Sequence, residues 1–289
     1  TLGDLDVGTQ ISVTVSYTDG QGTNESVTSV QTAPVVNVND APTGVPLITG
    51  TVTEDQTLTA DTSGIADADG LGTFSYQWLR NGVAIAGATG STYTLGDADV
   101  ASQISVTVSY IDGQGTNESL TSVPTASVVN VNDAPLLVTN TGSIVAEGGT
   151  DTIDASELAV TDLDNSVAQL TYSIGTGPLY GRLELTTAPG VSAATFTQAD
   201  IAANRLIYIH NGFETTSDSF TFTVNDGAGG SIGLTTVTLT ITPVNDAPTI
   251  TSDGGGAIAA LSVAENISAV TIVTGADVDL PAQALTYSI

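Results

Sequence analysis

The feature that most constrains the fold of this chain is an internal repeat. Residues 1–42 and 94–135 can be aligned without gaps at an offset of 93 residues, and they differ at seven positions. Both copies end in Asn-Asp-Ala-Pro, and the same four residues return at 245–248, 113 residues after the second copy. Self-similarity at such intervals is typical of tandem modules. We therefore expect complete modules at 43–135 and 136–248.

The repeat also predicts incomplete modules at both ends of the sequence. Residues 1–42 match only the closing part of the module at 43–135. Residues 249–289 end in ALTYSI, which matches QLTYSI at 169–174 of the preceding module. We expect the chain to be a segment of a longer repetitive protein, in which neighbouring modules of the same chain are one another's partners.

The pattern of apolar residues predicts β-strands. Residues 103–110, QISVTVSY, alternate apolar and polar side chains, which is the period of a half-buried strand. Residues 220–224 and 237–241 alternate in the same way, and only the stretch at 197–203 has a helical pattern. The sequence thus predicts an all-β chain of two-sheet sandwiches joined by short Gly/Asp turns.

The charge of the chain excludes several classes of partner. There are 31 acidic residues against three arginines and no lysine, for a net charge of -28. Such a field repels nucleic acid and anionic membranes and attracts cations, although solubility in salty surroundings is an alternative explanation. No apolar run reaches the ~18 residues of a membrane span, so we expect no membrane insertion. Without cysteine there is no disulfide framework.

The module at 43–135 contains the single tryptophan of the chain, in SYQWLRNGVAI. A tryptophan on a central strand, followed by LGDADVASQISVTV, resembles an immunoglobulin-like sandwich that lacks its disulfide. We expect Trp78 to pack in the core. Stacking on a sugar is the alternative role.

The Asn-Asp-Ala-Pro copies lead to a second resemblance. NVNDAP and PVNDAP resemble the cadherin linker Asp-x-Asn-Asp-Asn-x-Pro, with one Asn missing. VAENISAVTIVTGADVDLPAQALTYSI, at 263–289, is similar to the opening of a cadherin module. Residues 136–248, with TDLDNSVAQLTYSI and DSFTFTVNDG, resemble the cadherin-related repeats named after chondroitin sulfate proteoglycan, which fill giant bacterial surface adhesins. This implies a tandem array of immunoglobulin-like and cadherin-like sandwiches, secreted to the cell surface.

The resemblance implies Ca²⁺ at each place where a linker meets its neighbouring modules. We call each such place a junction. Ca²⁺ takes about six to eight oxygen ligands. Alternate side chains of an Asp-x-Asp segment share a face, and the linker proline fixes the backbone at the start of the next module. A cation bound by both neighbouring modules would make the flexible linker between them rigid. The missing linker Asn implies one or two ions at each junction.

The implied ligands fall into three sets. The first junction has Asn39, Asp40, Asp67, Asp69 and Asp112. The second has Glu54 from the preceding module with Asn132, Asp133, Asp162, Asp164 and Asp226. The third has Glu147 from the preceding module with Asn245, Asp246, Asp277 and Asp279. By a weaker match, Asp6, Asp99 and Asp200 occupy the place of another cadherin ligand. The alternative is that Asp-x-Asp and Asp-Gly only form turns.

No pattern in the sequence indicates an enzyme. His210 is the single histidine, and neither a nucleophile motif nor a zinc-type cluster accompanies it. We expect a structural stalk of a large secreted surface adhesin, with calcium-rigidified junctions that support cell adhesion or a biofilm matrix. One alternative is a laterally self-assembling extracellular filament or sheath subunit, whose partners are identical chains. Another is carbohydrate binding by one module.

Overall fold

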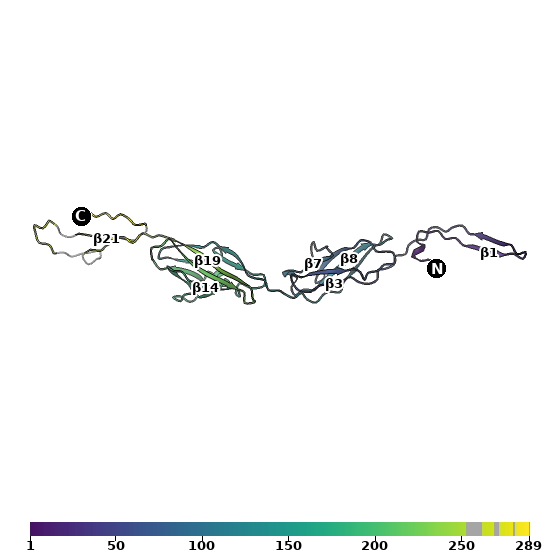
Figure 1. Cartoon of the computed structure of the whole chain (residues 1–289), viewed down its shortest axis with the longest axis horizontal. Helices are drawn as coiled ribbons and strands as arrows, with labels where there is room; N and C mark the ends of the chain where they lie inside the picture. The colour runs from purple at the N-terminus through teal and green to yellow at the C-terminus, as the bar shows by residue number, and fades with distance from the viewer. Residues whose placement is uncertain (253–261, 269–271, 280, 289) are drawn as a thin grey trace. The chain divides into compact units, whose positions relative to one another are not determined.

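The computed structural model describes residues 1–252, 262–268, 272–279 and 281–288, and it divides the chain into two compact units, Thr1–Val131 and Asn132–Ile289 (Figure 1). Strands account for 41% of residues and helices for 4%, so the predicted all-β fold is confirmed. Within the described part of the chain, no helix is long and apolar enough to cross a membrane.

The first unit consists of a hairpin followed by two sheets. The hairpin pairs β1 (Thr14–Thr18) with β2 (Asn24–Thr28). One sheet has the order β3 (Leu47–Thr49), β4 (Thr57–Asp61), β7 (Thr92–Thr94). The other has the order β6 (Val83–Ala84), β5 (Ser75–Arg80), β8 (Ile104–Ile111), β9 (Asn117–Thr121). Two 3-10 turns, η1 (Asp4–Asp6) and η2 (Asp97–Asp99), occupy equivalent places in the repeat.

The core of the first unit forms between these two sheets. The apolar side chains of β8 predicted to share one face are all buried. Trp78 on β5 is fully buried, donates a hydrogen bond from Nε1 to the Gly90 carbonyl at 2.9 Å, and stacks on Tyr93 with 5.7 Å between ring centroids. The expectation that Trp78 packs in the core is therefore confirmed.

The hairpin β1–β2 shows what the repeat determines by itself. Its register equals that of β8–β9, since Tyr17 faces Glu25 as Tyr110 faces Glu118. Tyr17 is nevertheless 61% exposed, whereas Tyr110 is 4% exposed. The repeated sequence reproduces the strand pairing, but burial requires a second sheet.

The second unit is built on larger sheets. Five strands have the order β11 (Ser143–Ala146), β19 (Ser231–Thr242), β18 (Ser217–Asn225), β14 (Thr171–Thr176), β16 (Thr195–Thr197), with β11 parallel to β19. Three strands have the order β12 (Thr150–Thr152), β17 (Leu206–His210), β15 (Gly181–Leu185). Two further pairs are β10 (Leu136–Asn140) with β13 (Leu158–Thr161) and β20 (Thr249–Ile250) with β21 (Gly275–Ala276).

The alternating residues of β18 and β19 line the core of the second unit. The apolar members of 220–224 and 237–241 are all buried, as predicted. Tyr172 on β14 stacks on Phe196, with ring centroids 4.8 Å apart. The short helix α1 (Gln198–Ala202) lies in the stretch predicted to be helical. The boundaries of the four predicted modules stay a prediction, while the division between the two units falls after Val131, directly before the second Asn-Asp-Ala-Pro.

Candidate metal centres

The three junctions share one hydrogen bond between the linker and the following Asp-x-Asp segment. The backbone N–H of each linker aspartate donates to a carboxylate oxygen of the second aspartate of that segment. The pairs are Asp40 with Asp69 at 2.7 Å, Asp133 with Asp164 at 2.6 Å, and Asp246 with Asp279 at 2.8 Å. The linker aspartate and the second aspartate of the Asp-x-Asp segment, predicted as ligands of the same junction, therefore lie in contact at each junction.

Each Asp-x-Asp segment is also a turn. The backbone N–H of its second aspartate donates to Oδ1 of its first. The pairs are Asp69 with Asp67 at 2.9 Å, Asp164 with Asp162 at 2.9 Å, and Asp279 with Asp277 at 3.1 Å. The hydrogen bond expected of a turn is therefore present in each segment, while metal binding by these residues stays a prediction. The turn uses one oxygen of the first aspartate and leaves other carboxylate oxygens for a ligand.

Three carboxylates converge at the first junction. Asp4, Asp40 and Asp69 each offer an oxygen, and these oxygens lie within 4.8 Å of one another. Asp69 is 6% exposed, and its Oδ1 is buried without a hydrogen-bond partner. The charge of Asp4, followed by burial and the charge of Asp69, raises the pKa of the Asp40 carboxyl. The cluster therefore gathers like charges, a condition that a cation relieves.

Two other predicted ligands of this junction are held by neighbouring polar groups. The Tyr110 hydroxyl donates to Oδ2 of Asp67 at 2.5 Å. Nδ2 of Asn39 donates to Glu118 at 2.8 Å. Burial is the main cause of the raised pKa of the Tyr110 hydroxyl, and the bond to Asp67 adds to it. These bonds fix the two side chains beside the cluster.

Asp112 lies in the adjacent loop and outside the three-carboxylate cluster. Burial acts to raise its pKa, but the backbone N–H groups of Thr116 and Gln114 outweigh that effect, and the pKa is lowered. Its Oδ2 is buried and has no hydrogen-bond partner. A Cβ at Gly113 would lie 2.5 Å from the Asp69 carbonyl oxygen, so the two loops pack closely. Asp112 thus belongs to the same end of the sandwich.

At the second junction the second unit supplies a buried, hydrogen-bonded carboxylate, Asp226. Its side chain is buried and accepts hydrogen bonds from the backbone N–H groups of 228–230 and from Nδ2 of Asn132. The Asn132 amide is the largest cause of the lowered pKa of Asp226, and burial opposes it. A Cβ at Gly230 would lie 2.3 Å from Asp226 Oδ2 and 2.8 Å from Ala134 Cα. The linker and this loop therefore pack without room for a larger residue.

The remaining predicted ligands of the second junction lie on both sides of the unit boundary. Oδ1 of Asp162 accepts from the N–H of Asn165, while its Oδ2 is buried without a partner. Glu54, in the first unit, is buried, and its Oε2 accepts from the backbone N–H of Val131 at 3.0 Å.

The third junction gathers a different set of carboxylates. Oxygens of Glu147, Glu214 and Asp246 lie within 4.8 Å of one another. Oε2 of Glu147 accepts from the backbone N–H of Val244 at 3.3 Å, whereas its Oε1 is shielded from solvent and has no hydrogen-bond partner. Nδ2 of Asn245 donates to the Asp246 carbonyl at 2.9 Å. Glu147 therefore contacts the linker, as Glu54 does before the second junction.

Two members of these clusters were not predicted. Asp4 stands two residues before Asp6, which was the predicted ligand in this turn. Oδ2 of Asp6 instead accepts from the backbone N–H of Gly3 at 3.0 Å and caps η1. Glu214 lies in the loop before β18, within no recognisable motif.

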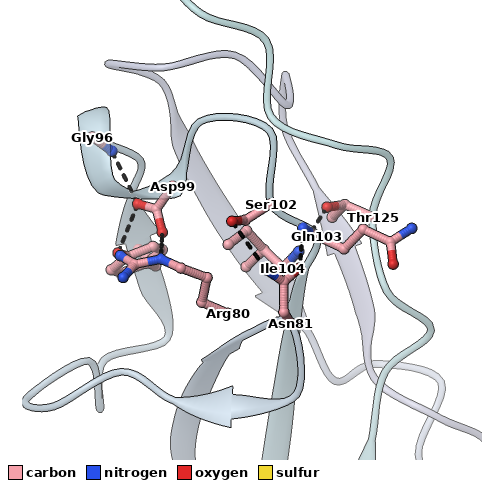
Figure 2. Close-up of polar contacts among 9 residues, drawn as sticks. Arg80, Asn81, Gly96, Asp99, Ser102, Gln103, Ile104 and Thr125 are labelled. Carbon is pink, nitrogen blue, oxygen red and sulfur yellow. Dashed lines mark hydrogen bonds and ion pairs between the residues drawn. The ribbon is translucent and has the colours of Figure 1, made fainter.

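Asp99, which was predicted as a metal ligand by a weaker match, makes several hydrogen bonds within the first unit (Figure 2). Asp99 is buried, accepts from Arg80 Nε and the Tyr93 hydroxyl at 2.8 Å each, and accepts from Gly96 N at 3.0 Å. Its carboxylate is therefore used within the first unit. Asp200 plays a similar part at α1, where it accepts from Thr197.

The arginines of the chain pair with carboxylates outside the three-carboxylate clusters. Each of the three arginines forms an ion pair: Arg80 with Asp99, Arg182 with Glu184, and Arg205 with Asp200. None of those carboxylates belongs to a three-carboxylate cluster. Buried His210 accepts at Nδ1 from the N–H of Gly148 at 3.0 Å. The clusters offer oxygen ligands alone, the donor set that suits Ca²⁺.

Comparison with known proteins finds a family match, sequence relatives and similar solved structures. Residues 135–242 match the family model described as cadherin-like. The chain is 29% identical to mouse extracellular matrix organizing protein FRAS1, over 68% of this chain and 5% of that protein. It is 39% identical to human chondroitin sulfate proteoglycan 4 over 38% of this chain and 5% of that protein. Human cadherin-23 repeats 21–23 align at 17% identity and a TM-score of 0.37, covering 74% of this chain and 72% of theirs.

The family match assigns residues 135–242 to the cadherin-like class, and the sequence relatives include an extracellular matrix protein. The predicted extracellular location is confirmed. The chain spans about 5% of the length of the FRAS1 and proteoglycan relatives. The ligand assignments of the individual residues stay predictions.

Proposed function

We propose that this chain is a non-enzymatic stalk segment of a large extracellular surface protein, and that Ca²⁺ bound at its junctions makes the stalk stiff. The observation that carries the proposal is the crowding of carboxylates at the first and third junctions, where buried oxygens of Asp69 and Glu147 lack hydrogen-bond partners. Each arginine is paired outside these clusters. A divalent cation would supply the missing positive charge.

The sequence positions of the ligands explain how binding would stiffen the chain. At the first junction, Asp4 and Asp40 precede the predicted module at 43–135, and Asp69 lies within it. At the third, Glu147 and Glu214 lie in the predicted module at 136–248, and Asp246 lies in its closing linker. A cation bound to each set would join a module to its linker. Without it, mutual repulsion of the carboxylates would let neighbouring modules move apart.

Membership of a bacterial adhesin, with roles in cell adhesion or a biofilm matrix, remains part of this proposal. The chemistry needed for a spacer is the same in any large surface protein. It consists of a stable sandwich, a short linker and a cation at the linker.

The stalk function can be tested by calcium titration. We expect calorimetry to detect calcium binding in the intact chain and chelation to lower its melting temperature. Saturation at one hundred times Kd stabilises the bound state by about 2.7 kcal/mol per site. Asp4→Asn with Asp69→Asn should remove binding at the first junction, and Glu147→Gln with Glu214→Gln at the third.

Glu25→Gln is the matched control, because it removes a charge from an exposed carboxylate outside every three-carboxylate cluster. Small-angle scattering then measures stiffness, and calcium should narrow the distribution of end-to-end distances. Scattering curves that superimpose with calcium and with chelator would reject the stiffening mechanism. Unchanged heats in both double variants would reject the assigned ligands.

A further inference from the structure

The chain contains two Asn-Gly pairs, Asn81-Gly82 and Asn211-Gly212. In such a pair the backbone nitrogen of glycine can attack the side-chain carbonyl carbon of asparagine. Glycine favours this step because it has no Cβ to obstruct the approach and its backbone is the most mobile. The glycine of each pair has a positive φ, so the two pairs make a comparison within one molecule.

The first pair is restrained on both ends of its carboxamide (Figure 2). Oδ1 of Asn81 accepts from the backbone N–H of Gln103 at 2.9 Å, and its Nδ2 donates to Ser102 Oγ at 3.1 Å. The backbone does not distinguish the two pairs, because the Asn81 N–H donates to the Gln103 carbonyl at 2.8 Å and the Asn211 N–H donates to the Tyr180 carbonyl at 2.9 Å. Cyclisation requires the carboxamide to rotate toward Gly82. The two carboxamide bonds of Asn81 must break before that rotation can occur.

The second pair is more open. Asn211 is exposed, and Oδ1 accepts from the N–H of Phe213 at 3.1 Å. Among the described residues, no hydrogen bond from its Nδ2 is found. The Gly212 N–H donates to Nδ1 of His210 at 3.2 Å. The attacking nitrogen of this pair therefore already donates a hydrogen bond to an imidazole nitrogen.

The orientation of that imidazole is fixed by its surroundings. His210 is buried, and Nδ1 also accepts from the N–H of Gly148 at 3.0 Å. Two N–H donors on Nδ1 require that nitrogen to be unprotonated, which places the ring proton on Nε2, beside Thr215 Oγ1 at 3.3 Å. The neutral tautomer with a basic Nδ1 is the form that a general base needs.

We propose that Asn211 is a site of spontaneous deamidation and that His210 assists it as a general base. The Gly212 nitrogen gives its proton to His210 Nδ1 and bonds to Cγ of Asn211. The Cγ–Nδ2 bond then breaks, and the departing nitrogen takes a proton and leaves as ammonia. Water opens the resulting succinimide to aspartate or isoaspartate. Asparagine plus water thus gives a carboxylate plus ammonium, with no other reactant.

The product would alter the loop that carries Glu214. The modified residue stands three positions before Glu214, and His210 contacts Gly148, next to Glu147. An isoaspartate lengthens the backbone of this loop, and either product adds a negative charge. An effect on calcium at the third junction rests on the proposed function, whereas the deamidation itself does not.

The test is incubation of the folded chain at neutral pH and 37 °C, followed by peptide mapping with mass spectrometry. Deamidation raises the mass of a peptide by about one dalton. We expect Asn211 to react at least about tenfold faster than Asn81, equivalent to a barrier lower by about 1.4 kcal/mol. In denaturing urea the two rates should become equal. Equal rates in the folded chain, or the same tenfold ratio in urea, would overturn the proposal.

Two variants separate the contributions. His210→Asn keeps an acceptor near the Gly212 N–H but removes the base, so the Asn211 rate should fall while the rate at Asn81 stays constant. An unchanged Asn211 rate in this variant, with its melting temperature preserved, would remove His210 from the proposal. If His210→Asn unfolds, Ser102→Ala provides a second comparison, because it frees Nδ2 of Asn81 and should speed that site. No acceleration there would overturn the role assigned to side-chain restraint.

Discussion

Replacing Asp99 by asparagine removes the charge that pairs with Arg80 and weakens the bonds to Tyr93 and Gly96. Loss of one partner from a buried ion pair costs about 3–5 kcal/mol. The Arg80 side chain is 32% exposed, so water can solvate it after the change. The amide of asparagine also retains part of the hydrogen bonding. We therefore expect Asp99→Asn to lower the free energy of unfolding of the first unit by about 2 kcal/mol.

The assay uses fluorescence of Trp78, the single tryptophan of the chain, which is buried in the first unit and stacked on Tyr93. Its emission during urea denaturation reports unfolding of that unit. With a urea dependence of about 1–3 kcal/mol/M, the midpoint should fall by roughly 1 M. The matched control is Asp6→Asn. Asp6 is the repeat equivalent of Asp99, and it caps η1 without an arginine partner among the described residues. Its effect on the free energy of unfolding should stay within the scatter of surface substitutions, about 0.5 kcal/mol.

Equal midpoints for the two variants would refute this reasoning. They would mean that capping of the 3-10 turn, which Asp6 and Asp99 share, accounts for the whole effect. The contacts of Asp99 with Arg80 and Tyr93 would then contribute nothing measurable to stability.

Two further predictions concern packing and alkaline pH. Gly230→Ala should lower the melting temperature of the second unit, measured by circular dichroism, because the added Cβ would lie 2.3 Å from Asp226 Oδ2. Gly233→Ala should leave the melting temperature unchanged, because its added Cβ would have no neighbouring atom within 4 Å. Burial, and then the bond to Asp99, raises the pKa of Tyr93, so the stability it contributes is present below the unfolded pKa of about 10 and is lost as pH rises beyond it. Urea midpoints of the first unit should fall between pH 9 and pH 11, and constant midpoints would contradict this.

Much of the fold follows from the spacing of apolar residues. The strands β8, β18 and β19 were predictable because one side chain in two is apolar, and a strand places those side chains on one face. The short helix α1 was predictable because Thr197 and Asp200 form a capping box with the correct spacing. Such features depend on neighbours within a few residues.

The composition of the acidic clusters was less accessible from the sequence. Asp4 and Asp6 alternate in the same short turn, and nothing local shows which of them faces the linker. Glu214 joins Glu147 through tertiary structure, because β11, whose end precedes Glu147, pairs with the sheet that contains β18. No spacing rule connects two loops that are more than sixty residues apart. The sequence therefore indicated the junctions but not every member of each cluster.

The repeat separates what the linker encodes from what its surroundings add. The bond from the linker aspartate to the Asp-x-Asp segment occurs at all three junctions, although the modules that follow differ in their predicted type. This contact is therefore specified by the linker and the turn alone. The third carboxylate differs, because Asp4 supplies it at the first junction, whereas Glu147 and Glu214 join the linker aspartate at the third. Since ligand charge and rigidity set calcium affinity, the junctions should bind with different affinities despite their shared linker sequence. A stalk built in this way would stiffen in steps as the calcium concentration rises.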